Sequence, residues 1–442
     1  MHRLHKLVLF ISALVLLCGR NVLADEKLPM RLTMREAVAI SLKQNPEIQI
    51  ANLNVALSEQ DRTIARSALL PQAKLEAFDR ATRRNLEAFI GTRLPGMPQH
   101  AGPFQTFQGG AAFSIPVFDL TLWRRFETAR QGVRGSQAQE LTVREEMTLL
   151  VVSQYLGSLR AAADVRAAQS RVRLAQELYD QAVELQKQGV GTGMDTLRAN
   201  VQLQNEKQTL IVTETQYKTA LHGLVRLLNL DPRQTVELSD EMSFFETPEF
   251  QADQGLERAL ATRPEMKALV SRELTASLRK KAASESRLPK VNVDGGWAYQ
   301  GLSLGSSIPS YQYQVTVEMP LFMGGRIQAE NAKANLELKK IAQEKQDLSN
   351  QIALEVNTAI DQLGSARHEV QVANLSVKLA EQEVGQARER FKAGVASNIE
   401  VTTAQDSLAR ANDHQVGALY RYSQARADLA RAIGQIEDLY TR

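Results

Sequence analysis

Two short stretches of the chain combine glycine, a hydroxyl side chain and a carboxylate, which are the residue types of a phosphate-binding loop. Residues 187–197 read KQGVGTGMDTL, and residues 392–402 read KAGVASNIEVT. Nucleotide-binding loops follow a strand and carry a fixed glycine spacing, or a Gly-Lys pair followed by Ser or Thr. The residues before Gly189 have a helical pattern and no such pair follows them. We therefore do not expect a nucleotide site.

The same polar residues fit the start of a helix better. In a capping box, a hydroxyl and a carboxylate three residues apart bond the free backbone N–H groups of a first helical turn. Thr192 with Asp195, and Ser397 with Glu400, have this spacing. Each stretch is predicted to end one helix and to begin the next.

No other pattern in the sequence predicts catalysis or a cofactor. The histidines at positions 2, 5, 100, 222, 368 and 414 are scattered, and Cys18 is the single cysteine. The sequence contains no recognisable catalytic triad, paired-carboxylate site, or zinc or haem motif. We expect no enzyme activity, no metal and no cofactor.

The N-terminus has the order of a secretory signal. Arg3 and Lys6 precede an apolar run over residues 7–17, and Val-Leu-Ala at 22–24 fits a cleavage site. The apolar run is shorter than the ~20 residues of a membrane-spanning helix. We predict a signal peptide over residues 1–24.

Cleavage there changes the charge of the chain. The whole sequence has 53 Lys and Arg against 50 Asp and Glu, and residues 1–24 hold three of the basic residues and no acid. The mature chain is then neutral, so charge gives no support for nucleic-acid binding. Cys18 also leaves with the signal. Leu17 is large where lipoprotein sites prefer a small residue, so lipidation of Cys18 is not expected.

The rest of the chain contains an internal repeat of two related halves. The repeated stretches are NPEI (45–48) with RPEM (263–266), LLPQ (69–72) with RLPK (287–290), and PVF (116–118) with PLF (320–322). We predict a first repeat over 25–230, a connecting segment over 231–252 and a second repeat over 253–442. Each repeat is expected to hold short helices, a strand pair (about 72–118 and 290–320) and a long helical hairpin (about 120–229 and 325–439).

The helical hairpins are predicted from proline placement and from a heptad pattern. All 13 prolines lie outside 117–231 and 321–442, and a proline inside a helix costs about 3 kcal/mol. Apolar residues recur every seven positions, as in Val356, Leu363, Val370, Val377, Val384 and Phe391, or Ala161, Ala168, Ala175 and Ala182. Such a repeat predicts left-handed coiled coils. Each glycine stretch is then the tip of a long antiparallel hairpin.

The strand pairs show apolar and polar residues in alternation. Between 311 and 319 the alternation is strict, 291–299 and 107–117 are similar, and 72–84 alternates less cleanly. A half-buried sheet in a soluble domain would give the same pattern. A length of about ten residues suits a tilted membrane strand. Aromatic residues gather near the loop like an interfacial girdle, namely Trp297, Tyr299, Tyr311 and Tyr313.

Membrane strands would also require an oligomer. A sheet in lipid must close because an open edge leaves backbone groups without hydrogen bonds. Closed barrels have at least about eight strands, so the four strands of one chain would have to join those of other chains.

In its ordered motifs the chain resembles the outer membrane efflux protein family, the TolC-like channels. The motifs are LTMREAVAISLKQNPEI, ARSALLPQ, IPVF, MPLFMGGR and the two glycine tips, duplicated in register. The resemblance implies a mainly α homotrimer with a membrane β-barrel part. Four strands per chain would contribute to a shared 12-stranded barrel in outer membrane lipid, and long antiparallel coiled-coil helices would form an α-helical tunnel in the periplasm.

The resemblance also assigns roles to the tips. Gly189, Val190, Gly394 and Val395 would face a periplasmic adaptor, which connects to an inner membrane transporter. The chain would be the passive exit duct of a tripartite efflux or type I secretion system. Asp195, Phe391 and Glu400 would lie at the periplasmic entrance.

Three positions depart from the best-known member of the family. Phe391 replaces a tyrosine, Thr403 replaces an acid in the lumen, and Ala396 replaces an arginine that ties the tips together. Arg388, Arg390 or Lys392 could supply the missing cation. A ring of three Glu400 side chains would bias the entrance toward cations.

One alternative explains the heptads differently. A periplasmic coiled-coil scaffold or adaptor without a pore would have the hairpins, but it would not need two pairs of amphipathic strands.

Overall fold

A computed structural model describes residues 29–93, 95–189, 191–245, 252–393, 395 and 398–441, except for the side chains of residues 391, 392 and 398. Several predicted features therefore lie outside the described residues: the signal peptide with Cys18, part of the connecting segment (246–251), the tip residues Val190, Gly394, Ala396 and Ser397, and the side chain of Phe391.

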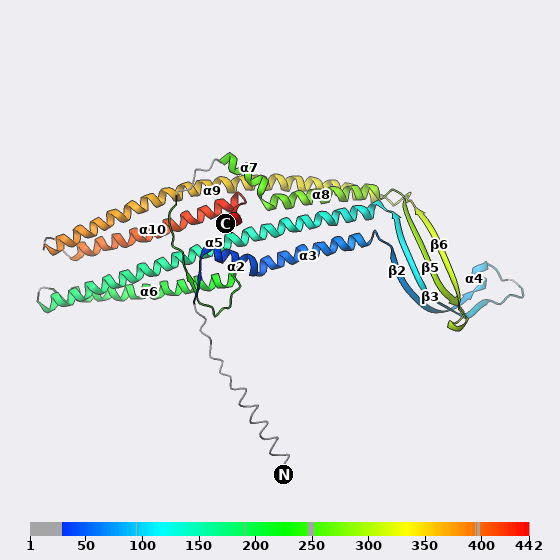
Figure 1. The fold of residues 1–442 in the computed structure, drawn as a ribbon, viewed down its shortest axis with the longest axis horizontal. Helices are drawn as coiled ribbons and strands as arrows, with labels where there is room; N and C mark the ends of the chain where they lie inside the picture. The colour runs from blue at the N-terminus through cyan, green and yellow to red at the C-terminus, as the bar shows by residue number, and fades with distance from the viewer. Residues whose placement is uncertain are drawn as a thin grey trace, which may run out of the picture. The chain divides into compact units, whose positions relative to one another are not determined.

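The chain is mainly helical and divides into two compact units (Figure 1). Unit 1 consists of Met1–Ser41, Gln154–Ser243 and Leu379–Tyr420. Unit 2 consists of Leu42–Ser153, Phe244–Lys378 and Arg421–Arg442. Each unit takes segments from both predicted repeats.

Unit 1 contains the tips of two helical hairpins. The first joins α5 (Leu120–Lys187) to α6 (Gly193–Leu227), and the second joins α9 (Arg326–Lys392) to α10 (Asn398–Ala432). The heptad positions form the seams as predicted, and the buried ones include Ala168, Ala175, Ala182, Leu203, Val384, Ala387, Ala404 and Ala411. Because alanine is small, the helix backbones approach closely along these seams.

A short parallel ribbon completes unit 1. β1 (Met30–Leu32) pairs with β4 (Val236–Leu238) in parallel. The fully buried Tyr155 anchors this ribbon to α5, since its hydroxyl lies 2.8 Å from the Leu32 carbonyl oxygen and 3.0 Å from a carboxylate oxygen of Asp240.

Unit 2 is built on an antiparallel sheet with the strand order β2–β3–β5–β6. The strands are β2 (Gln72–Asn85), β3 (His100–Phe118), β5 (Lys290–Gly301) and β6 (Ile308–Glu318). Strand β3 begins earlier than its alternation predicted. After a register shift, Asn85 still pairs with His100, so the strand pair continues beyond the alternating stretches 72–84 and 107–117. The loops hold α4 (Leu86–Ile90) and η1 (Leu304–Ser306).

Four helices continue the four strands in the same lateral order. The chain passes from α3 (Pro46–Ser67) into β2, from β3 into α5, from α8 (Pro264–Glu285) into β5, and from β6 into α9. Side-chain contacts join neighbouring helices: Ser58 with Ser136, Arg124 with Glu285, and Ser284 with Asn331. Polar contacts thus fix the helices in the order set by the sheet (Figure 1).

One apolar core cluster of unit 2 is formed in part by α9 itself. α7 (Ala252–Thr262), α9 and α10 contribute Ala259, Ile352, Val356 and Leu429 to one buried cluster, which Ile433, just after α10, completes. The chain ends with α11 (Ile436–Thr441). Among the described residues, none of the helices combines the length and the apolar character needed to cross a membrane.

Candidate functional site

The first hairpin tip turns on Gly189. Its φ of +75° is a left-handed conformation that glycine adopts without strain. The N–H of Gly189 donates to the Gln186 carbonyl at 3.1 Å, and the N–H of Gly191 donates to the Leu185 carbonyl at 2.9 Å. These bonds satisfy the last carbonyls of α5, so the glycines end the helix as predicted.

Thr192 and Asp195 then start α6 through the predicted capping box. The Asp195 N–H donates to Thr192 Oγ1 at 3.3 Å, and the Thr192 N–H donates to Asp195 Oδ2 at 3.2 Å. The Thr192 hydroxyl also donates to the carboxylate at 2.6 Å. These hydrogen bonds lower the pKa of Asp195. The first tip therefore carries the negative charge of Asp195, whose carboxylate is bonded to the start of its own helix.

A second contact closes the first hairpin from the side. The Thr196 hydroxyl of α6 donates to Gln186 Oε1 of α5 at 2.7 Å. The turn is thus held by polar bonds between residues that are close in sequence, with little apolar burial.

The second tip is described only in part. The Val395 N–H donates to the Arg390 carbonyl at 3.0 Å, and the Val395 side chain is exposed. The predicted capping box of Ser397 with Glu400 stays a prediction because Ser397 is not described.

Glu400 makes a different contact from Asp195. Its Oε1 lies 3.0 Å from Arg390 Nε, which joins α10 to α9 across the hairpin. Both side chains are about half exposed, and such a surface pair contributes at most ~1 kcal/mol. Arg390, one of the three cations suggested by the sequence, therefore contacts Glu400 and partly neutralises that carboxylate.

An ion pair that the sequence did not suggest joins the two hairpins of unit 1. Arg171 on α5 lies 3.3 Å from Glu206 on α6 and 3.2 Å from Asp413 on α10. These residues flank the alanine seams, but no spacing rule in the sequence relates positions so far apart.

The four predicted belt aromatics lie together on one face of the sheet. Trp297 is paired directly with Tyr311 across β5 and β6. The ring centroids of Trp297 and Tyr299 are 5.3 Å apart, and those of Tyr311 and Tyr313 are 5.8 Å apart. Gly295 makes room for these rings, since a Cβ there would lie 2.7 Å from the Tyr313 ring. This apolar face is exposed in the single chain.

The opposite face of the sheet is polar. It borders a cavity of about 850 Å³, and the polar side chains around the cavity include Lys74, Glu76, Gln108, Asp294 and Gln312. The two faces have the contrast required of a wall between lipid and water.

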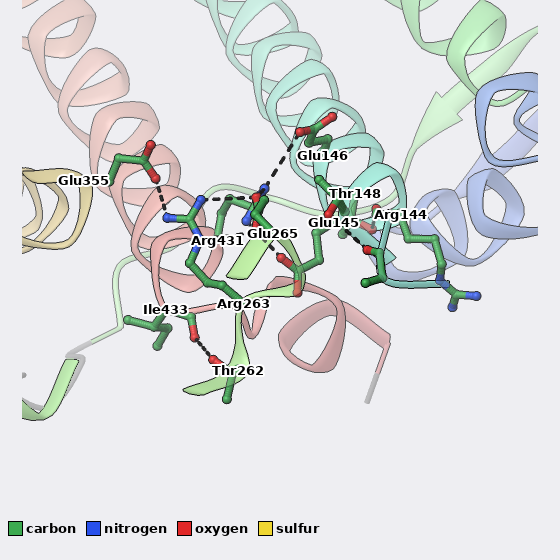
Figure 2. Close-up of polar contacts among 12 residues, drawn as sticks. Arg144, Glu145, Glu146, Thr148, Thr262, Arg263, Glu265, Glu355, Arg431 and Ile433 are labelled. Atoms are coloured by element: carbon green, nitrogen blue, oxygen red, sulfur yellow. Dashed lines mark hydrogen bonds and ion pairs between the residues drawn. The ribbon is translucent and has the colours of Figure 1, made fainter. Parts of the chain in front are cut away.

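A buried charge cluster in unit 2 was missed by the sequence reasoning (Figure 2). Arg431 contacts Glu265 and lies 2.9 Å from Glu145, while Arg263 contacts Glu355 and lies 3.2 Å from Glu265. The cluster joins four segments of unit 2, from α5, α8, α9 and α10. Its members are distant in sequence, which is why no motif predicts it.

The two central carboxylates of the cluster have opposite pKa shifts. Burial alone would raise the pKa of Glu265, but hydrogen bonds from Arg263 and Arg431 lower it to about 2. Burial raises the pKa of Glu145 to about 7, and the attraction of Arg431 offsets this only in part. Glu145 is therefore the member of the cluster that exchanges a proton near neutral pH.

Within the described part of the chain, no group of three or more His, Cys, Asp or Glu side chains could hold a metal ion. The described residues thus form a sheet with one apolar and one polar face, helices that continue its strands, and two polar hairpin tips.

Comparison with known proteins decides the family. The model of the family described as "Outer membrane efflux protein" matches residues 38–230 and 255–435. The chain belongs to this family. The two matched segments lie on either side of the connecting segment.

Individual members of the efflux protein family are distant in sequence. The alkaline protease secretion protein AprF of Pseudomonas aeruginosa is 24% identical and aligns over 92% of this chain and 85% of its own. The pyoverdine export outer membrane protein OpmQ of Pseudomonas putida is 22% identical over 90% of this chain and 85% of its own. The crystal structure of the CmeC outer membrane channel of Campylobacter jejuni superimposes with a TM-score of 0.78 at 17% identity, covering 91% and 86% of the two chains.

As a member of the efflux protein family, the chain is an exit duct of an export system in the outer membrane, and its helical part lies in the periplasm. The proteins it is similar to are channels and transport proteins. The roles of the individual tip and belt residues remain predictions.

Proposed function

We propose that three copies of this chain form one passive duct, in which their sheets close into a 12-stranded barrel and their hairpins form the tunnel. The observation that carries this proposal is the sheet itself. Its outer strands, β2 and β6, each have a single partner among the described strands. In lipid those free edges need hydrogen-bond partners, and the edges of a second and third copy supply them.

Exposed apolar residues on the helices support an assembly of copies. α3 exposes Ile50, Leu53, Leu57 and Ile64 at spacings of three, four and seven residues, which place them on one side of the helix. A stripe of this kind in water indicates a protein interface. In the proposed trimer, α3 is the first of the four helices of each chain and packs against the last helix, α9, of the next.

At the other end, the tips are proposed to meet a periplasmic adaptor, which connects the duct to an inner membrane transporter. Gly189, Val190, Gly394 and Val395 would form the adaptor-facing turns. Asp195, Phe391 and Glu400 would line the entrance, with the Glu400 charge reduced by Arg390. The energy for export would come from the transporter.

The experiment that tests the duct combines mass and conductance. Native mass spectrometry of the detergent-extracted mature protein should give three times the mass of one chain. Planar bilayers should then show discrete current steps. A protein that is soluble without detergent, monomeric and silent in bilayers would refute the duct and favour a periplasmic scaffold.

A matched pair of variants tests which face of the sheet meets lipid. Val315→Arg places a charge on the apolar face of β6, where arginine near the bilayer midplane costs about 2–4 kcal/mol. Gln314→Arg places the same charge on the polar face of the same strand. Only Val315→Arg should abolish recovery of the protein from outer membranes, and equal loss in both variants would contradict the assignment.

A further inference from the structure

A second cavity of unit 2 lies where the helices meet the sheet. Its volume is about 810 Å³, and it is lined by the first turns of α5 and α9, the last turns of α8 and the start of β5. Its floor is made of small residues, including Ala129, Ala276, Ala282 and Ala334. Small side chains on three neighbouring helices leave this space open.

The lining of this cavity, which we call the basic groove, is strongly cationic. Its charged residues are Arg125, Arg279, Lys290, Arg326, Lys333, Glu330 and Glu337. Two of the cations are already paired: Lys290 lies 3.1 Å from Asp119, and Arg326 lies 3.6 Å from Glu330.

Three cations of the basic groove remain for a ligand. In the described part of the chain, Arg125, Arg279 and Lys333 make no ion pair, and all three are exposed. They come from three different helices, α5, α8 and α9. The three cations are therefore not the solvated face of a single helix. Their N–H donors surround the cavity from three sides.

The basic groove lies on the polar side of the sheet. Side chains of a strand alternate between two faces, so Lys290 shares its face with Asn292 and Asp294. Asp294 lines the polar cavity described above, and Lys290 lines the basic groove. The groove therefore continues the polar face, which lines the interior of the proposed duct.

We propose that the basic groove binds oxyanion groups, carboxylate or phosphate, of the exported cargo at the junction of tunnel and barrel. Guanidinium groups match both oxyanions through paired N–H donors, and lysine adds a point charge. Three copies would place nine such cations around one passage, against three Glu337 carboxylates, so an excess of positive charge remains. This inference rests on the proposed duct for its position, whereas binding of an oxyanion to the chain can be measured independently.

The first test is direct binding. Titration calorimetry of citrate, and separately of inorganic phosphate, into the detergent-solubilised mature protein at low salt compares three proteins. They are the unmodified chain, the groove variant Arg125→Gln/Arg279→Gln/Lys333→Gln, and the control variant Arg62→Gln/Arg66→Gln/Lys339→Gln. The control removes the same charge from exposed positions outside the groove.

The unmodified chain and the control variant should bind with similar affinity, and the groove variant should bind at least about ten-fold more weakly, an effect that rising salt reduces. Tighter citrate binding would identify carboxylates as the cargo groups, and tighter phosphate binding would identify phosphates. Because the three cations make no ion pairs, the groove variant should keep the circular dichroism spectrum of the unmodified chain.

Three outcomes would overturn the proposal. The first is equal binding to the groove and control variants, and the second is no binding to the unmodified chain. The third is anionic phospholipid binding that the groove variant loses while citrate binding is unchanged, because that result would place the groove on the membrane side. Citrate binding that depends on the groove, in a protein without conductance, would instead refute the duct and leave the binding site standing.

Discussion

The two halves of the chain begin their equivalent helices with different polar chemistry. In the first half, Asn45 precedes Pro46, and its side chain accepts hydrogen bonds from the N–H groups of Glu47 and Ile48 at 2.9 and 3.4 Å. In the second half, Arg263 precedes Pro264 and makes no side-chain cap. It reaches instead to Glu265 and to Glu355 on another helix.

The hairpin tips show the same difference. Asp195 caps the helix that it starts, whereas Glu400 reaches back to Arg390 on the preceding helix. The described contacts of the first-half residues are with their own helix starts, and those of the second-half residues include a neighbouring helix. The same backbone thus allows either a local cap or a contact with another helix. Every helix start needs partners for its N–H groups, but the two repeats do not share the same long-range partners.

The largest predicted effect separates the two helix starts. Arg263→Ala should lower the free energy of unfolding by about 3–5 kcal/mol, because it removes one of the two cations that contact the carboxylate of Glu265 and the cation that contacts Glu355. Asn45→Ala should cost about 1 kcal/mol through loss of a cap. Denaturant titration followed by circular dichroism at pH 7 measures both. Equal effects would mean that the charge cluster is no more important than a helix cap.

The next effect depends on pH and concerns Glu145. Its pKa of about 7 in the folded chain exceeds the ordinary value of 4.5, so the folded state holds a proton that the unfolded state releases. The stabilisation from this proton is complete below pH 4.5 and is lost as pH rises through 7. At one pKa unit per 1.36 kcal/mol, the loss is on the order of 3 kcal/mol.

Glu145→Gln should therefore raise the unfolding midpoint at pH 8 relative to the unmodified chain, and the gain should vanish near pH 4.5. Glu146→Gln is the matched control, because Glu146 is more exposed and lies 4.0 Å from Arg431. Glu265→Gln should act in the opposite direction at pH 7, since the pKa of Glu265 is lowered to about 2. A pH-independent gain for Glu145→Gln would contradict the assignment.

A smaller effect is expected at the first tip. Asp195→Ala removes one partner of the capping box and should cost about 1 kcal/mol at the start of α6. Hydrogen exchange should show faster opening of the first turn of α6 with little change elsewhere. Thr209→Ala is the control, because its hydroxyl bonds only a carbonyl within the same helix, that of Asn205. Similar exchange in both variants would show that the cap does not hold the tip.

The smallest change in stability is expected at the second tip. Arg390→Ala breaks an exposed pair and should change the free energy of unfolding by less than about 1 kcal/mol. In bilayers under a salt gradient, it should nevertheless raise cation preference, because Glu400 loses its compensating charge. Glu400→Ala should lower that preference. Arg388→Ala is the control, and an equal response to it would remove Glu400 from the entrance.

Much of the fold follows from the sequence for physical reasons. The heptad alanines and valines predict the seams because burial requires a repeated face, and the alternation in 311–319 predicts β6 because strand side chains have a period of two. The glycine of the first tip predicts the turn because glycine adopts positive φ without strain, and Gly189 has positive φ. These signals are local.

The features that the sequence did not predict depend on contacts between distant segments. The pairing of Arg431 with Glu145, the junction of Arg171 with Asp413 and the basic groove each need the relative placement of several helices. The extension of β3 before residue 107 depends on its register with β2. No spacing within one segment contains this information.

The tips also bear on how the chain reaches its native state. Contacts in the first hairpin start ten residues apart, where Thr196 bonds Gln186, and extend to 66 residues apart, where Gln154 donates to the Ala220 carbonyl. The entropic cost of closing a loop is smallest for the pair that is nearest in sequence. We therefore expect the contacts of the hairpin to form first beside Gly189 and then progressively farther from it. The turn would then be the nucleus of folding, and a slow turn would delay every contact beyond it.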